Sequence, residues 1–169
     1  MDRMVFLLFV WMGLVFFGCQ SARRQAAPPV ISANVRKIVV LIPGSPIARD
    51  WRGDAGPDGI LANAYFFQSA NRPPVAARGV IHAFLYDQRD YKSNPRQAKP
   101  IYQWTFDLSQ ARQHVRRDQL GWLYYQFPLD WGRKVPKGPD VLLIFAFEPQ
   151  SDNRKWTYSL PAPIMVRRK

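Results

Sequence analysis

Cysteine, histidine and glutamate are scarce in this sequence. Its 169 residues include one cysteine, Cys19, two histidines and a single glutamate, Glu148. Without a second cysteine no internal disulfide can form, so Cys19 has no structural partner within the chain. The folded part of the protein must therefore be stabilised by packing alone.

The common catalytic signatures are also absent. The sequence has no Gly-x-Ser-x-Gly, no His-Glu-x-x-His, no Gly-x-x-x-x-Gly-Lys and no dinucleotide-binding fingerprint. Neither His82 nor His114 has a Cys, His or Glu near it at the spacing of metal ligands. We expect His82 to be a packed or edge-exposed strand residue and His114 a solvated helix residue. The sequence favours a protein that is not an enzyme, and a hydrolase built from distant aspartates is the alternative.

Long hydrophobic runs are missing except at the N-terminus. Residues 4–18 form an unbroken apolar run of fifteen residues that follows Arg3 and ends at Cys19. A membrane-spanning helix needs about 20 apolar residues, so this run is short for a span and suits a secretory signal. An uncleaved N-terminal membrane helix with an incidental cysteine is the alternative.

The end of this run resembles the lipobox of bacterial lipoproteins. The residues are Phe16, Phe17, Gly18 and Cys19, where the family has Leu, a small residue, Gly or Ala, and Cys. The resemblance implies cleavage before Cys19 and attachment of acyl chains to it, and Gln20 implies passage to the outer membrane. We therefore expect a signal peptide over residues 1–18, a lipidated cysteine and flexible tether over 19–34, and a β domain over 35–169 of a lipid-anchored bacterial cell envelope protein.

The chain has a large excess of positive charge. It has 24 Lys and Arg against 12 Asp and Glu, a formal net charge of +12. Such a balance is typical of nucleic-acid binders, but an exported protein does not meet nucleic acid. Its plausible anionic partners are lipid headgroups, lipopolysaccharide or acidic cell-wall polymers, and a generic solvated basic surface is the alternative.

The pattern after the tether predicts a mostly β protein. Short apolar or alternating segments bounded by Pro, Gly and Asp predict strands within 35–42, 59–69, 77–87, 101–107, 122–131, 141–147, 155–160 and 164–166. The segment over 141–147 is apolar on both faces, which indicates a central strand, and Pro128 indicates an edge or a bulge. Between strands, Asp107 and Gln110 fit the capping box of a short helix that ends at Gly121.

These elements favour a single antiparallel β-sandwich, immunoglobulin-like in the broad sense, with about seven strands and one short helix. A small closed barrel is the alternative. Together with the lipobox, this pattern resembles small bacterial lipoproteins with one β-rich domain of unassigned function. The resemblance extends to no functional motif.

Two weaker site candidates remain. Asp50, Asp54 and Asp58 resemble a calcium-binding loop, in which oxygens at alternating positions surround Ca²⁺, but Arg52 stands where a second carboxylate belongs. A salt-bridged structural turn without metal is the alternative.

Trp122 and Tyr124 are expected on the face of their strand that is opposite to the core. There they could stack on sugar rings. The leading hypothesis is thus a lipid-anchored, non-enzymatic binding or assembly module of the envelope, whose partner is an anionic envelope component or another envelope protein. A glycan-binding module with an exposed tryptophan platform is the second hypothesis.

Overall fold

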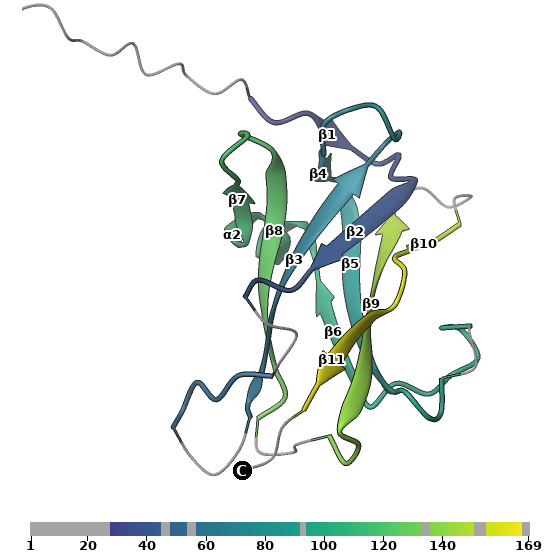
Figure 1. Cartoon of the computed structure of the whole chain (residues 1–169). Coiled ribbons are helices and arrows are strands. Elements are labelled where there is room, and N and C mark those ends of the chain that lie inside the picture. Colours follow the sequence, from purple (N-terminus) through teal and green to yellow (C-terminus); the bar gives the residue numbers. More distant parts are fainter. Residues whose placement is uncertain are drawn as a thin grey trace, which may run out of the picture.

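The chain folds mainly into β-strands with one short helix (Figure 1). The computed structural model describes residues 28–44, 48–53, 57–91, 94–132, 136–150 and 155–166. The predicted signal peptide and Cys19 lie outside these residues. The expectation of a mostly β protein with one short helix is confirmed.

One antiparallel sheet has four strands in the order β2-β3-β8-β7. Their bounds are Lys37–Leu41 for β2, Gly59–Phe67 for β3, Leu123–Asp130 for β8 and Val115–Arg117 for β7. The alternation predicted for β8 is present, because its alternate side chains from Leu123 to Leu129 are buried. Strand β7 pairs with β8 only as far as Tyr125. At Pro128, β3 is the one described strand that pairs with β8, so this residue lies at an edge of the described sheet, as predicted.

A second antiparallel sheet has the order β10-β9-β5-β6, and β11 also pairs with β9. The bounds are Thr157–Tyr158 for β10, Asp140–Pro149 for β9, Gly79–Asp87 for β5, Tyr102–Phe106 for β6 and Ala162–Met165 for β11. Strand β9 has β5 on one side and both β10 and β11 on the other. Its predicted central position is therefore confirmed.

A third, two-stranded sheet pairs β1 (Ile31–Ser32) with β4 (Ala76–Ala77) in parallel. Strand β1 falls inside the range expected to be tether, so strand pairing begins before Val35. The described residues contain eleven strands rather than about seven. Each of the eight predicted segments corresponds to a strand, and β1, β4 and β7, which are two or three residues long and have no pattern of their own, are additional.

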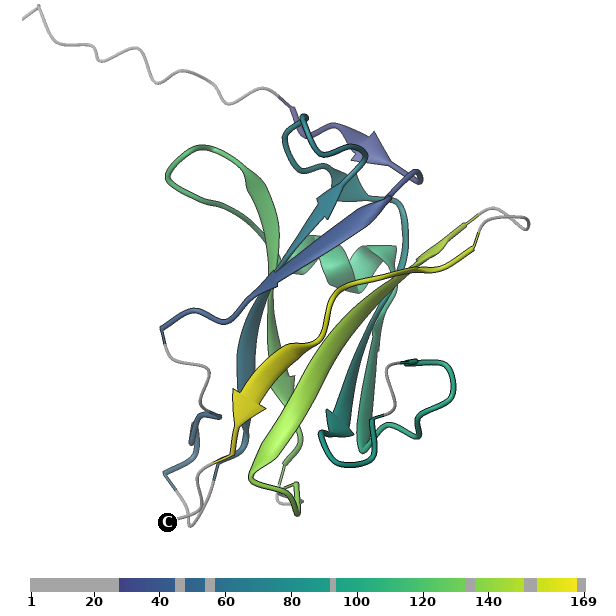
Figure 2. The same cartoon turned by 45° about the vertical axis from the view of Figure 1, so that its right-hand side comes forward.

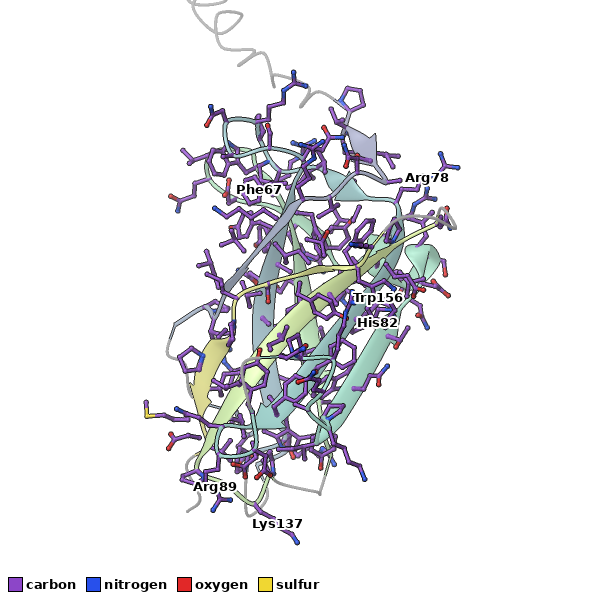
Figure 3. The ribbon with its side chains drawn as sticks, turned by 90° about the vertical axis from the view of Figure 1, so that its right-hand side faces the viewer. Phe67, Arg78, His82, Arg89, Lys137 and Trp156 are labelled. Carbon is purple, nitrogen blue, oxygen red and sulfur yellow. The ribbon has the colours of Figure 1, made fainter. Side chains whose placement is uncertain are left out.

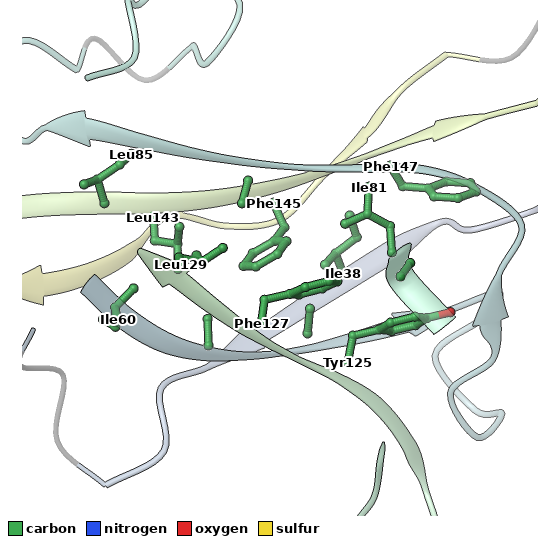
Figure 4. Close-up of a cluster of buried hydrophobic side chains, with 14 of the residues drawn as sticks. Ile38, Ile60, Ile81, Leu85, Tyr125, Phe127, Leu129, Leu143, Phe145 and Phe147 are labelled. Carbon is green, nitrogen blue, oxygen red and sulfur yellow. The ribbon is translucent and has the colours of Figure 1, made fainter. Parts of the chain in front are cut away.

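The two larger sheets contribute to one hydrophobic core. Side chains from β2, β3 and β8 meet side chains from β5, β9 and β11 in a single buried cluster (Figure 4). Aromatic contacts join the sheets, with Phe66 against Phe147 at 6.2 Å and Phe127 against Phe145 at 5.6 Å between ring centroids. Because no disulfide is available, this aromatic packing is a main source of stability.

The helix is shorter than expected. Helix α2 spans Leu108–Gln113, and its predicted capping box is present. The Asp107 carboxylate accepts from the Gln110 backbone amide, and the Gln110 side-chain oxygen accepts from the Asp107 backbone amide. The expected stop at Gly121 is wrong. Val115 instead starts β7, and Gly121, with φ 77°, lies in the turn between β7 and β8. Pairing with β8 satisfies the backbone groups of residues 115–117 as a continued helix would, so the tertiary context overrides the local helical pattern here.

The domain has two distinct ends. The chain enters the described residues at the end that carries β1, β4 and the β7–β8 turn, which we call the N-terminal end (Figures 1 and 2). Phe67 and Arg78 lie toward this end, whereas Arg89 and Lys137 lie at the opposite end (Figure 3). The C-terminal strand β11 also runs toward the opposite end (Figure 2).

Candidate functional site

The loop predicted to bind calcium is organised around Asp58. This residue is 2% exposed, and its Oδ2 accepts hydrogen bonds from the backbone amides of Trp51 and Arg52, both at 2.8 Å. The Arg52 Nε lies 3.5 Å from the other carboxylate oxygen. Three donors thus surround the Asp58 carboxylate, which in a calcium loop would face the metal. These donors make the surroundings of the carboxylate electropositive.

Arg52 also ties the loop to the end of β8. Its Nη2 lies 3.0 Å and 3.3 Å from the two carboxylate oxygens of Asp130. Asp50 accepts from the Gly53 amide at 2.6 Å, which is an ordinary turn contact. Asp54 lies outside the described residues. Within the part of the chain that is described, no three His, Cys, Asp or Glu side chains are grouped as metal ligands. These contacts favour the salt-bridged turn, and the calcium site stays a prediction.

Tyr124 lies on the face of β8 opposite to the buried Leu123 and Tyr125, and Trp122 directly precedes this strand. Trp122 is 41% exposed, and the Tyr124 ring stacks on Tyr65 with centroids 5.4 Å apart and planes at 25°. We call these three residues the aromatic face. Burial, followed by the nearby Asp118 carboxylate, raises the pKa of Tyr65, and the phenol hydrogen-bonds to that carboxylate.

Polar groups border the aromatic face. Gln126 donates to the Asn63 side chain at 3.2 Å, one step along β8 and β3 from the stacked tyrosines. On the other side, Arg116 of β7 is directly opposite Tyr124, and its Nη1 donates to the Gln113 and Val115 carbonyls at 3.0 Å and 2.8 Å. A partly exposed ring stack with amides and an exposed arginine beside it can bind a flat, hydroxylated or anionic ligand.

The other tryptophans follow the expectation that most of them pack. Trp131 is buried, and its indole N–H donates to the Pro57 carbonyl at 2.8 Å. Trp104 and Trp156 are half-buried. Trp51, like Trp122, is 41% exposed, but it lies over Gly59 at the opposite end of the domain. The exposed tryptophans therefore do not form one platform.

A groove opens between the edges of the two large sheets. It has a volume of about 670 Å³ and is lined by residues 36–42 of the β2 segment and by Tyr158 and residues 160–163 of the β10–β11 segment. At one end the Thr157 hydroxyl donates to the Val35 carbonyl at 2.8 Å and closes it. Exposed Leu41 and Leu160 line the open part. The sequence predicted both strands but not that their edges face each other.

Sequence reasoning also missed a polar pair on the β5 strand. The buried His82 lies with Nε2 3.0 Å from the Glu148 carboxylate and Nδ1 3.1 Å from the Thr105 hydroxyl. The Trp156 indole stacks on its ring at 4.6 Å and 6° (Figure 3). Both ring nitrogens are engaged and one ring face is covered, which is an arrangement suited to structure. Only strand pairing brings the single glutamate to His82, so no sequence spacing could have indicated it.

The other histidine departs from its expectation. His114 is the C-cap of α2 and is half-buried, with its ring 5.6 Å from Phe106 and 5.1 Å from Phe127 between centroids. Burial is the largest cause that lowers the pKa of His114, and Arg116 adds to it. The expected solvated position is wrong, because the chain leaves the helix one residue later and folds this ring onto the core.

No helix among the described residues has the length and apolar character needed to cross a membrane. Comparison with protein-family models, with curated proteins and with solved structures finds no match to this chain.

Proposed function

We propose that this protein is a lipid-anchored component of a bacterial cell envelope that binds an anionic envelope partner without catalysing a reaction. Acyl chains on Cys19 hold it on the periplasmic side, at the outer membrane. The two large sheets form the layers of an immunoglobulin-like β-sandwich. The aromatic face is its binding surface, and the net charge of +12 selects an anionic ligand.

The observation that carries this proposal is the aromatic face with its polar border. The half-buried Tyr124 stacks on Tyr65, which is 9% exposed, and the exposed Arg116 is opposite Tyr124 in the strand register. The tyrosine rings can contact a sugar ring or a lipid headgroup, while the Arg116 guanidinium can pair with a phosphate or carboxylate. Lipopolysaccharide and acidic cell-wall polymers combine both features.

The buried aspartates support a role without catalysis. Asp58 and Asp87 are the buried carboxylates of the described residues, and each is bound by an arginine. Arg89 lies 2.9 Å from Asp87, and its hydrogen bonds hold the pKa of that carboxyl below its usual value. A hydrolase needs a carboxyl that can exchange a proton with substrate, and these two are held as ion pairs.

A neutral glycan is the second candidate ligand, and the Tyr65–Tyr124 stack favours it. Stacking on a sugar ring needs no charge on the ligand. The two candidates differ in their response to salt, because the Debye length falls from about 10 Å at 0.1 M to about 3 Å at 1 M.

The test measures binding of the full chain, kept in detergent, to lipopolysaccharide and to a neutral N-acetylglucosamine oligomer. We expect lipopolysaccharide binding that weakens at least tenfold between 0.1 M and 1 M salt. Trp122→Ala should weaken it further, whereas Trp51→Ala is the matched control, because Trp51 has the same 41% exposure at the opposite end. Equal effects of both substitutions would contradict the aromatic face. Salt-insensitive binding of the oligomer with quenched tryptophan fluorescence would favour the neutral glycan.

The anchor is tested separately in membranes by mass spectrometry of the protein and of a Cys19→Ala variant. We expect an acylated Cys19 at the N-terminus of the wild type. Retention of the variant as a full-length chain in the membrane would instead favour an uncleaved helix.

A further inference from the structure

The β7–β8 turn presents two large apolar side chains to solvent at the N-terminal end. Leu120 is 75% exposed and Trp122 is 41% exposed. The turn does not need either side chain, because the Asp118 carboxylate accepts from the amides of residues 120 and 122, both at 2.9 Å, and Gly121 supplies the positive φ. A polar residue would serve the turn equally well, so the exposed Leu120 is unexplained by folding.

A second exposed apolar pair lies at the same end of the domain. Val30 is 64% exposed and Ile31 is 52% exposed, directly after the point where the chain enters the described residues. Pairing of β1 with β4 holds this segment in place, since the Ala76 amide donates to the Val30 carbonyl at 2.8 Å. In both ribbon views β1 and the β7–β8 turn lie at one end (Figures 1 and 2).

Exposed basic side chains lie on several segments that reach this end of the domain. They come from the start of β2, the loop before β4, the segment before β5, strand β7 and the segment before β10: Arg36, Lys37, Arg72, Arg78, Arg117 and Lys155. Arg78 lies toward this end (Figure 3). The acidic residue of the turn, Asp118, already binds the turn amides. An apolar tip with a basic rim is the composition of surfaces that bind anionic bilayers.

The length of chain before this end places it near a membrane. Eight residues lie between Cys19 and Pro28, the first described residue. Fully extended, the nine Cα–Cα steps from Cys19 to Pro28 span at most about 30 Å. An anchor on Cys19 therefore keeps the N-terminal end close to the bilayer, where even weak contacts act at high effective concentration.

We propose that the N-terminal end docks on an anionic phospholipid surface, with Leu120, Trp122, Val30 and Ile31 at the level of the headgroups. The aromatic face then borders the docked end, because Trp122 belongs to both surfaces. This inference rests on the lipid anchor of the proposed function and adds an orientation to it. The occupant of this surface is the bilayer that holds the chain.

The test uses the full chain, expressed with its own N-terminus and reconstituted into vesicles. In one variant Leu120→Cys carries an environment-sensitive fluorophore, and in the matched control the fluorophore is on Gln88→Cys, an exposed position at the opposite end. Vesicles contain phosphatidylcholine alone or with 30% phosphatidylglycerol, and a quencher is attached to the lipid acyl chains. We expect at least threefold stronger quenching at position 120 than at 88 in anionic vesicles, and we expect salt or Arg72→Glu to reduce it.

Equal quenching at the two positions, or none at position 120 in vesicles that carry the protein, would overturn the docking. Quenching at 120 that is the same without phosphatidylglycerol would overturn the role of lipid charge. Crosslinking of two chains through position 120 in place of quenching would assign the surface to a second copy. Flotation with the vesicles and mass spectrometry of Cys19 report the anchor independently, so loss of the anchor and loss of docking give different results.

Discussion

Replacing Asp58 by alanine separates the structural turn from a calcium site. In the structure the Asp58 carboxylate, 2% exposed, accepts from the amides of Trp51 and Arg52 at 2.8 Å. A hydrogen bond to a charged group contributes about 1.5 to 3 kcal/mol, and water can partly replace the carboxylate at this half-buried loop. The half-exposed ion pair with Arg52 adds little. We therefore expect Asp58→Ala to lower the free energy of unfolding by about 3 kcal/mol.

The loss should appear in thermal unfolding followed by circular dichroism. For a domain of this size 1 kcal/mol corresponds to roughly 2 to 4 °C, so Asp58→Ala should lower the Tm by about 6 to 12 °C. Asp58→Asn keeps an oxygen acceptor and should lose about half as much. Asp50→Ala is the control, because its hydrogen bond to the Gly53 amide is exposed, and it should cost less than about 1 kcal/mol.

A calcium site would behave differently. At a free Ca²⁺ concentration 100 times its Kd, binding would stabilise the wild type by about 2.7 kcal/mol, a rise in Tm of roughly 5 to 11 °C. We expect the Tm to be the same in Ca²⁺ and in EDTA. A rise with Ca²⁺ that Asp58→Asn abolishes, or a loss below about 1 kcal/mol in Asp58→Ala, would refute the reasoning from these contacts.

Three further predictions follow from the core and the titratable groups. Phe127→Ala should lower the free energy of unfolding, measured in urea, by about 3 to 5 kcal/mol. The reason is that the centroid of the Phe127 ring lies 4.3 Å from that of Phe106 and 5.6 Å from that of Phe145. A loss below about 1 kcal/mol would contradict this packing. Burial raises the pKa of Tyr86 to about 12, so this tyrosine ionises in the unfolded chain before it does in the folded one. The free energy of unfolding should therefore fall by about 2 to 3 kcal/mol as the pH rises from 10 to 12. Tyr86→Phe should reduce this fall, and an unchanged dependence of stability on pH would count against the prediction. Burial lowers the pKa of His114, so as the pH drops this imidazole is protonated in the unfolded chain before it is in the folded one. The Tm should therefore fall as the pH drops below about 6.5. We expect His114→Gln to reduce that fall, whereas an identical pH profile would argue that the ring is solvated.

Local patterns were reliable wherever one strand face is buried. The alternation around Phe127 identified both the strand and its core face, and the apolar run around Phe145 identified a central strand. Asp107 and Gln110 identified the helix start, because a capping box is a contact within four residues. These signals depend on neighbours in the chain, which the sequence contains.

The misjudged features depend on neighbours in space. Val115 has the spacing of a helical residue but pairs with Tyr125, so a hairpin replaces the rest of the helix. His82 and Glu148 are 66 residues apart and meet because β5 pairs with β9. Asp58 has the sequence context of a metal ligand, yet the amides and guanidinium that surround it are visible only once the loop is folded.

The sequence alone thus determined the β class, most strands, the helix cap, the excess of positive charge and the expectation of an anchor at Cys19. Those properties follow from composition and from periodicity, which act over a few residues. The tertiary structure decided that Tyr65 stacks on Tyr124, that two sheet edges face each other across a groove, and that apolar and basic side chains gather where the chain enters the domain. Each of these features needs the register and packing of strands that are distant in the chain, and no local pattern encodes that pairing.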